Sequence, residues 1–160
     1  MIVLGIGDYG ATSNPNEVIK TFGLGSCVAV ICTDVNVKIA GMIHIALPDS
    51  TISTGRANEK PGYFADTGLP ALFESLRKVG WREGSGKLAI KLAGGATIMD
   101  PNGTFNIGKR NILAIKKILW SVGLGPMAED IGGNISRTVT VSADTGAVLI
   151  TSPARPPLNL

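Results

Sequence analysis

Residues 27–46 read CVAVICTDVNVKIAGMIHIA, and this stretch decides the fold. Residues 27–33 are rich in β-branched side chains, which predicts a buried strand. Residues 38–46 alternate between larger apolar and smaller or polar side chains, which predicts a second strand. Because the segment from Asp34 to Val37 has turn-forming residues, the two strands are expected to form an antiparallel hairpin.

The segments outside this hairpin contain more strands than helices. Helices are predicted at 66–79 and 107–122, where apolar side chains recur every three or four residues. A polar loop from Pro48 to Gly62 could cover a site. Strands are predicted over residues 1–7, 17–22, 87–92 and 126–131, with a second hairpin over residues 137–150.

This order of elements predicts one layered α+β domain over residues 1–152. Residues 153–160 are a Pro-rich tail that is expected to be extended or mobile. The chain has 160 residues, of which 44% are hydrophobic and 17% charged. Such a composition suits a folded domain and argues against disorder.

The charge pattern gives no support for a nucleic-acid or membrane partner. The formal net charge is +3, which is too weak for nucleic-acid binding. The N-terminus lacks the basic region of a signal peptide, and no apolar run reaches the ~18 residues of a membrane span. We therefore expect a cytoplasmic protein, acting as a monomer. The nearest approach to a basic cluster falls on the predicted second helix and is expected to be solvated; it comprises Lys109, Arg110, Lys116 and Lys117.

The two cysteines, Cys27 and Cys32, are expected to be free thiols. On one strand their Cα atoms would lie about 16 Å apart at ~3.3 Å per residue, whereas a disulfide needs less than about 7 Å. The odd spacing also sends the two side chains to opposite faces of the sheet. Because the chain has one histidine, a zinc site is not expected either. Free thiols suit a reducing compartment.

The register of the hairpin bears on chemistry because His44 is the single histidine. If Thr33 pairs with Lys38, Cys27 lies directly opposite His44, with Cβ atoms roughly 5 Å apart. A thiol with a pKa of about 8.5 is mostly protonated at neutral pH, and an adjacent imidazole can accept its proton. Cys27 is therefore a candidate nucleophile and His44 its candidate base. The simpler interpretation of both residue types is a place in the core.

Two further features belong to this hypothesis. The glycines before Cys27 permit a turn whose backbone N–H groups, at Gly25 and Ser26, could stabilise an oxyanion. A third group would orient the imidazole, and Thr21, at the end of the preceding strand, could accept from its far ring nitrogen. Spacing alone leaves three acidic alternatives open, namely Asp34, Asp49 and Asp66.

Three other glycine-containing segments are interpreted structurally. Gly94-Gly95 and Gly132-Gly133 are expected to mark turns, since neither lies in a phosphate-binding motif. The stretch Gly108-Lys109-Arg110-Asn111 is interpreted as the start of a helix.

Seven segments of the sequence resemble motifs of the CheD-type chemoreceptor glutamine deamidases. Residues 21–28, TFGLGSCV, resemble the nucleophile motif of that family, and residues 41–48, GMIHIALP, resemble its histidine motif. Together and in this order, these two motifs are quite specific. The further matches follow in family order and are YFADTGLP (63–70), KLAGGA (91–96), IGKRN (107–111), DIGGN (130–134) and DTG (144–146).

This resemblance implies that Cys27, His44 and Thr21 are the nucleophile, the base and the orienting residue of a protein-glutamine deamidase. It implies a layered α+β sandwich of packed mixed or antiparallel β-sheets flanked by helices, similar to the catalytic domains of deamidating bacterial toxins. The implied substrate is glutamine on the helical cytoplasmic region of chemotaxis receptors, with receptor methyl esters hydrolysed by some members. Many members bind a CheC-type phosphatase, and no metal or cofactor is expected. The alternatives are a non-catalytic regulator of such a phosphatase and a cysteine hydrolase for small amides or peptides.

Overall fold

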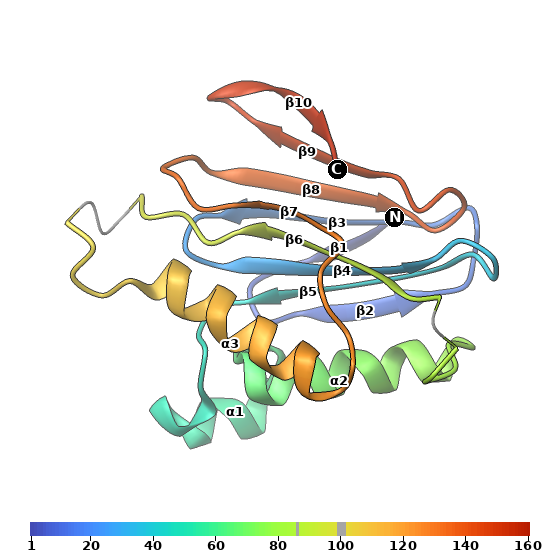
Figure 1. Cartoon of the computed structure of the whole chain (residues 1–160), viewed down its shortest axis with the longest axis horizontal. Coiled ribbons are helices and arrows are strands. Elements are labelled where there is room, and N and C mark those ends of the chain that lie inside the picture. The colour runs from blue at the N-terminus through green and yellow to red at the C-terminus, as the bar shows by residue number, and fades with distance from the viewer. Residues whose placement is uncertain (86, 99–101) are drawn as a thin grey trace.

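The computed structural model describes residues 1–85, 87–98 and 102–160, which form two five-stranded sheets and a layer of helices (Figure 1). Sheet A contains, in spatial order, β1 (Ile2–Leu4), β3 (Val18–Leu24), β8 (Arg137–Ser142), β9 (Val148–Ser152) and β10 (Arg155–Asn159). Sheet B contains β2 (Tyr9–Thr12), β5 (Ile39–Ile45), β4 (Val28–Asp34), β6 (Ala89–Gly94) and β7 (Ala128–Ile131). Both sheets are mixed, since β1–β3 and β6–β7 pair in parallel.

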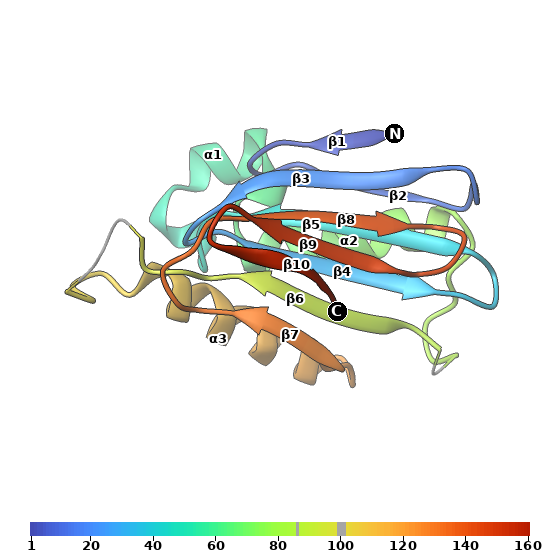
Figure 2. The same ribbon diagram turned by 90° about the horizontal axis from the view of Figure 1, so that it is seen from above.

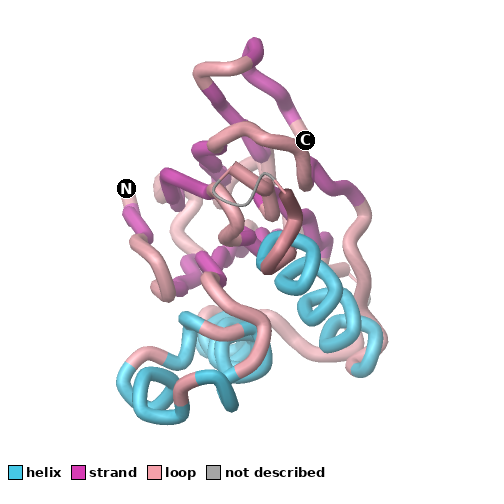
Figure 3. The backbone as a smooth tube through the Cα atoms, turned by 90° about the vertical axis from the view of Figure 1, so that its left-hand side faces the viewer, coloured by secondary structure: helices cyan, strands magenta, loops and turns pink. Residues whose placement is uncertain are grey.

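The helices lie on the face of sheet B that points away from sheet A (Figures 1 and 3). They are α1 (Thr54–Glu59), α2 (Ala65–Lys78) and α3 (Ile107–Ser121), with short 3-10 turns η1 (Ser50–Ile52) and η2 (Pro61–Tyr63). Among the described residues, no helix is both long enough and apolar enough to cross a membrane. The two stacked sheets, with helices on the outer face of sheet B, confirm the predicted α+β layered sandwich.

Strand β4 lies at the centre of sheet B, and every one of its residues is buried. Its alternate side chains enter two separate cores. Val28, Val30 and Cys32 pack toward α2 and α3. Ala29 and Ile31 pack toward sheet A, which lies over sheet B when viewed from above (Figure 2). A period of two along the strand thus builds both interfaces of the sandwich.

The predicted free thiols are present, on opposite faces as expected. Cys32 lies in the core beneath the helices, whereas Cys27, just before β4, packs against the core between the sheets. The odd spacing of the two residues produces this division.

The hairpin of β4 and β5 forms, but its register differs by two residues from the predicted one, since Thr33 pairs with Ala40 and not with Lys38. Asp34 pairs with Ile39, and His44 pairs with Ala29 instead of Cys27. Lys38 lies in the turn with a φ of 54°, a left-handed conformation that takes it out of the strand. Because the shift moves each pair by two positions, Cys27 and His44 remain on the same face of sheet B.

The prediction from the sequence also missed several short elements. The segment expected to be a polar loop, residues 48–62, contains η1, α1 and the start of η2. The side chain of Asp66 accepts hydrogen bonds from the N–H and hydroxyl of Ser50, which ties this segment to α2. Two strands were not predicted at all, namely β2 and β10, and β10 lies within the Pro-rich tail 153–160.

Asp130 joins the two sheets near the end of β7. Its carboxylate accepts from Arg137 Nε at 3.0 Å and from both terminal nitrogens of Arg155. Arg137 is only 3% exposed. Burial acts to raise the pKa of Asp130, but the hydrogen bonds and charges of Arg155 and Arg137 outweigh it and lower that pKa. The ionised carboxylate therefore stabilises the folded state above the unfolded-state pKa.

We expect Asp130→Asn to lower the free energy of unfolding at neutral pH by about 3 kcal/mol, because it leaves a buried guanidinium without its counter-charge. Asp144→Asn is the control, since Asp144 pairs with Lys38 on the exposed surface and should cost less than about 0.5 kcal/mol. Urea unfolding measures both. The deficit of Asp130→Asn should shrink as the pH falls below about 4, where Asp130 becomes protonated in the unfolded chain, and should disappear once the pH passes below its lowered pKa in the folded protein. Equal losses for the two variants would contradict this account.

Candidate active site

Thr21 and His44 meet in the interior between the two sheets. The Oγ1 atom of Thr21, on β3, lies 2.7 Å from Nδ1 of His44, on β5. Thr21 is fully buried and His44 is 1% exposed. Thr21 Oγ1 also donates to the carbonyl of Leu4, at 2.8 Å. The hydroxyl therefore bridges sheet A to the histidine of sheet B.

These contacts fix the tautomer of His44. A hydroxyl has one hydrogen to donate, and Thr21 gives it to Leu4. Toward His44 the hydroxyl can only accept, so Nδ1 carries the proton and Nε2 holds a free lone pair. In the described part of the chain, Nε2 has no hydrogen-bond partner. The imidazole is thus oriented with its basic nitrogen available.

The acidic alternatives for this orienting role are engaged elsewhere. Asp34 accepts from the N–H of Asn36 in the hairpin turn, and Asp49 accepts from the N–H of Thr51 at the start of η1. Asp66 binds Ser50, as described above. Thr21 is the side chain that hydrogen-bonds to the imidazole.

Cys27 and His44 lie diagonally across the end of the β4–β5 ladder. Cys27 is two residues before Ala29, the residue that pairs with His44. Side chains in this diagonal relation stand roughly 7–8 Å apart at the backbone and can approach closely when they are long. Cys27 is half-buried, whereas His44 is buried.

Burial holds both groups in their neutral forms. It raises the pKa of the Cys27 thiol to about 11, although the backbone N–H of Cys27 itself acts in the opposite direction. Burial also lowers the pKa of His44 to about 4, against the opposing charge of Asp8. At neutral pH the free protein therefore holds a thiol and a neutral imidazole, and not a thiolate–imidazolium pair.

A neutral pair makes a testable prediction for the reactivity of Cys27. Because the thiolate reacts with iodoacetamide, the alkylation rate of Cys27 should rise about 10-fold per pH unit between pH 6 and 9. Peptide mapping by mass spectrometry would follow Cys27 separately from Cys32. A rate that is independent of pH across this range would mean that an ion pair is already formed, and would contradict the prediction.

The backbone N–H groups just before and at Cys27 differ in whether they already donate a hydrogen bond. Gly25 N–H donates to the carbonyl of Gly23 at 3.1 Å, in a tight turn. Within the described residues, the N–H groups of Ser26 and Cys27 have no backbone acceptor. Of the two predicted oxyanion donors, Ser26 is therefore the better placed, and Cys27 N–H joins it as a candidate.

Gly94 and Gly95 have a role that the sequence did not indicate. Gly94 is the last residue of β6 and Gly95 follows it directly, so the expected turn is not where these residues lie, although both have positive φ values of 115° and 69°. A side chain on Gly94 would collide with the carbonyl oxygen of Cys27, and the N–H of Gly95 donates to that same oxygen at 2.9 Å. The end of β6 thus packs against the backbone of Cys27 and hydrogen-bonds to it. A glycine pair is common in turns, and nothing in its spacing points to Cys27.

Asn111 was also missed, because the segment Gly108–Asn111 was interpreted only as a helix start. Its side chain is fully buried and donates to the carbonyls of Ser26 and Ala46, each at 3.0 Å. A buried amide on an otherwise apolar helix face is the signal that could have identified it.

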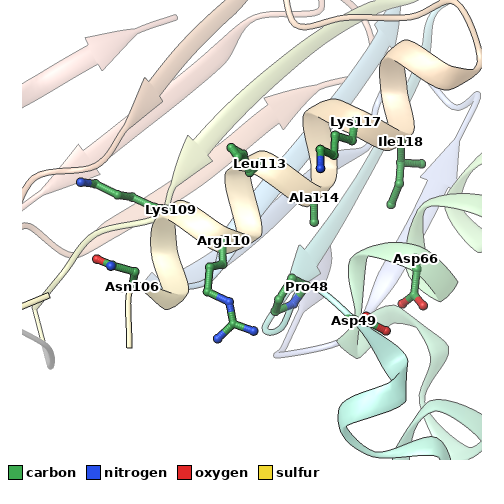
Figure 4. A pocket seen from close by; sticks show the side chains of 10 residues that line it. All are labelled: Pro48, Asp49, Asp66, Asn106, Lys109, Arg110, Leu113, Ala114, Lys117 and Ile118. Atoms are coloured by element: carbon green, nitrogen blue, oxygen red, sulfur yellow. The ribbon is translucent and has the colours of Figure 1, made fainter. Parts of the chain in front are cut away.

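Two open cavities flank α3. The first, of about 700 Å³, lies between α3 and the segment around Pro48, with Lys109, Arg110 and Lys117 on its helical wall (Figure 4). The second, of about 860 Å³, is lined by residues that include Gly95 and Gly133. Cys27 and His44 line neither cavity. Gly95, which lines the second cavity, nevertheless donates its N–H to the carbonyl of Cys27.

We expect Thr21→Val to lower kcat about 10-fold or more with little change in KM, because the imidazole loses the acceptor that fixes its tautomer. Thr33→Val, which alters a buried threonine on β4 of sheet B, is the matched control. Steady-state kinetics on a protein substrate would measure both variants. Equal kcat values for the two variants would mean that Thr21 does not orient the base.

The fold and the site define a layered α+β protein in which a half-buried cysteine, Cys27, and the buried His44 share one sheet face, the arrangement that a cysteine hydrolase would require. Comparison with known proteins identifies its family. A family model described as CheD chemotactic sensory transduction matches residues 46–152. The chain belongs to the CheD family.

Its relatives resemble it over nearly their whole length. A probable chemoreceptor glutamine deamidase CheD of Syntrophotalea carbinolica is 52% identical over 154 residues, which cover 96% of this chain and 95% of that protein. The chemoreceptor glutamine deamidase CheD of Thermotoga maritima is 45% identical over 148 residues, covering 92% and 89%. The probable chemoreceptor glutamine deamidase CheD 2 of Anaeromyxobacter dehalogenans is 43% identical over 152 residues, covering 95% and 94%.

Proposed function

We propose that this protein hydrolyses glutamine side chains of chemoreceptors to glutamate, with Cys27 as nucleophile, His44 as base and Thr21 as the orienting residue. The names of its relatives support the reaction and the substrate. The observation that carries the residue assignment is the hydrogen bond between Thr21 and His44 Nδ1, which leaves Nε2 as a free base on the same sheet face as Cys27. No metal or cofactor takes part in the proposed steps.

The first half of the reaction forms a thioester. The Cys27 thiol passes its proton to His44 Nε2 as Sγ bonds to the carboxamide carbon of glutamine. The resulting oxyanion accepts hydrogen bonds from backbone N–H groups, for which Ser26 and Cys27 are the proposed donors. His44, now protonated, gives its proton to the nitrogen as the C–N bond breaks and ammonia leaves.

The second half releases glutamate. Water attacks the thioester carbon while His44 Nε2 accepts one of its protons. The C–S bond breaks, and the thiolate takes the proton back from His44. The same steps would hydrolyse a methyl ester, with methanol as the leaving group. Because the resting pair is neutral, proton transfer accompanies the attack instead of preceding it.

The surroundings of the site suggest where the substrate approaches. The cavity that begins at Gly95 lies beside the backbone of Cys27 and has the glycines Gly132 and Gly133 in its wall. A protein segment lying there would bring a glutamine side chain to the half-buried thiol. A reactive free thiol also favours a reducing compartment, so we place the reaction in the cytoplasm. Binding of a CheC-type phosphatase and action as a monomer belong to the same proposal.

Incubation with cytoplasmic fragments of chemoreceptors tests the proposed function. The expected result is a gain of about 1 Da at specific glutamine-bearing peptides, with release of ammonia, as amide hydrolysis requires. Heat-denatured protein is the control. No gain with a range of receptors would favour a non-catalytic regulator of a phosphatase. Hydrolysis of small amides without any change in the receptors would favour a general cysteine amidase.

A further inference from the structure

Asn111 links the two segments that carry the proposed nucleophile and base. It is the fifth residue of α3, and its side chain is fully buried. The amide nitrogen Nδ2 donates to the carbonyl of Ser26 and to the carbonyl of Ala46, both at 3.0 Å. Ser26 precedes Cys27 directly, and Ala46 follows His44 by two positions. One side-chain amide therefore uses both of its hydrogens at the site.

The link replaces a missing part of the strand ladder. Pairing between β4 and β5 ends at Val28 and Ile45, so Cys27 lies just beyond the last pair. The N–H of Ala46 turns away and donates to Tyr63. Beyond the ladder, Asn111 Nδ2 holds the Cys27 side of the hairpin to the His44 side. The buried carbonyl of Ala46 and the partly buried carbonyl of Ser26 each accept a hydrogen bond in this way.

Helix α3 is held firmly enough to act as a support. Gly108, in the first turn of α3, packs so closely on Gly95 that a side chain at position 108 would collide with the carbonyl of Gly95. The N–H of Gly95 donates to Cys27, and the N–H of Ala96 donates to Gly25 at 2.8 Å. The start of α3, the end of β6 and the nucleophile loop thus form one packed unit around Asn111.

We propose that Asn111 is a positioning residue of the reaction, which sets the separation between the Cys27 thiol and the His44 imidazole by clamping the carbonyls of Ser26 and Ala46. This inference rests on the proposed function. It assigns Asn111 no contact with substrate. A misplacement of about 1 Å at a reacting group can cost about 100-fold in rate, so a clamp of this kind matters for turnover.

The test compares Asn111→Asp and Asn111→Ser with Ile115→Val. Asn111→Asp keeps the shape but removes both N–H donors, and Asn111→Ser is the second variant in case the carboxylate prevents folding. Ile115→Val perturbs the same buried face of α3 one turn further on, away from the two carbonyls. We expect the Asn111 variants to lower kcat about 100-fold with KM within about twofold, whereas Ile115→Val stays near the wild type.

Alkylation of Cys27 by iodoacetamide supplies a readout that needs no receptor. Without the clamp the loop should admit water, so the alkylation rate of Cys27 at pH 8 should rise in the Asn111 variants and stay unchanged in Ile115→Val. If the wild type deamidates no receptor, the proposed function fails. The alkylation rates then still show whether Asn111 holds the loop that carries Cys27. An Asn111 variant that is as stable as Ile115→Val, with wild-type kcat and a wild-type alkylation rate, would overturn the inference.

Discussion

Cys27→Ala is expected to abolish receptor deamidation, with a loss of at least about 10⁴-fold in kcat. The variant retains the fold, because Cys27 is half-buried at a strand end and alanine removes only one sulfur atom. It cannot form the thioester, and neutral imidazole alone is a poor catalyst of amide hydrolysis. The gain in mass of receptor peptides over time, compared with the wild type, measures the loss.

The chain contains its own control for this experiment. Cys32→Ala removes the other thiol, which is fully buried on the opposite face of β4 and packs beneath the helices. It should reduce stability slightly while leaving kcat within a few-fold of the wild type, since core thiols act as small apolar groups. Full activity of Cys27→Ala, or equal losses for the two variants, would remove Cys27 from the mechanism.

His44→Gln should lower kcat by about 10³-fold or more, because no other imidazole in the chain can take the thiol proton. Glutamine is a suitable replacement because it is close to histidine in size and its amide does not accept a proton at neutral pH. The variant therefore removes the base and keeps most of the volume of the buried side chain. Initial rates of ammonia release, with thermal unfolding to check the fold, measure the effect.

The double variant Cys27→Ala/His44→Gln tests whether the two groups act as one unit. Groups that share a proton in one step show strongly non-additive losses, so the double variant should be about as slow as Cys27→Ala alone. Losses that multiply would indicate that His44 serves a step independent of Cys27, contrary to the proposed mechanism.

The central hairpin was predictable because its composition and its periodicity agree. The β-branched run of β4 and the alternation of β5 predicted both strands, and the odd spacing of Cys27 and Cys32 predicted their opposite faces. The prediction that Cys27 and His44 lie on the same sheet face required only a turn with an even number of residues. It is therefore correct although the predicted register was wrong. Spacing left Thr21 and three aspartates open as the group that orients His44, and the family resemblance favoured Thr21, whose hydrogen bond to His44 is present in the structure.

The register itself was not predictable, because it depends on one backbone conformation. Lys38 adopts a left-handed φ that lysine rarely takes, and no local sequence signal marks it. Edge strands β2 and β10 were missed because short strands at a sheet edge derive their order from tertiary pairing and not from local propensity. Asn111 and Gly94 act through residues far away in the sequence, which spacing does not reveal.

The most direct test of the central claim is a reaction of the protein with a chemoreceptor fragment in the presence of hydroxylamine. A thioester on Cys27 would be captured by this nucleophile and leave a hydroxamate at the target glutamine, which peptide mass spectrometry distinguishes from glutamate. If a thioester forms on Cys27, hydroxamate will appear with the wild type and be absent with Cys27→Ala. Turnover that yields only glutamate at saturating hydroxylamine, or hydroxamate formed by Cys27→Ala at the wild-type rate, would contradict it.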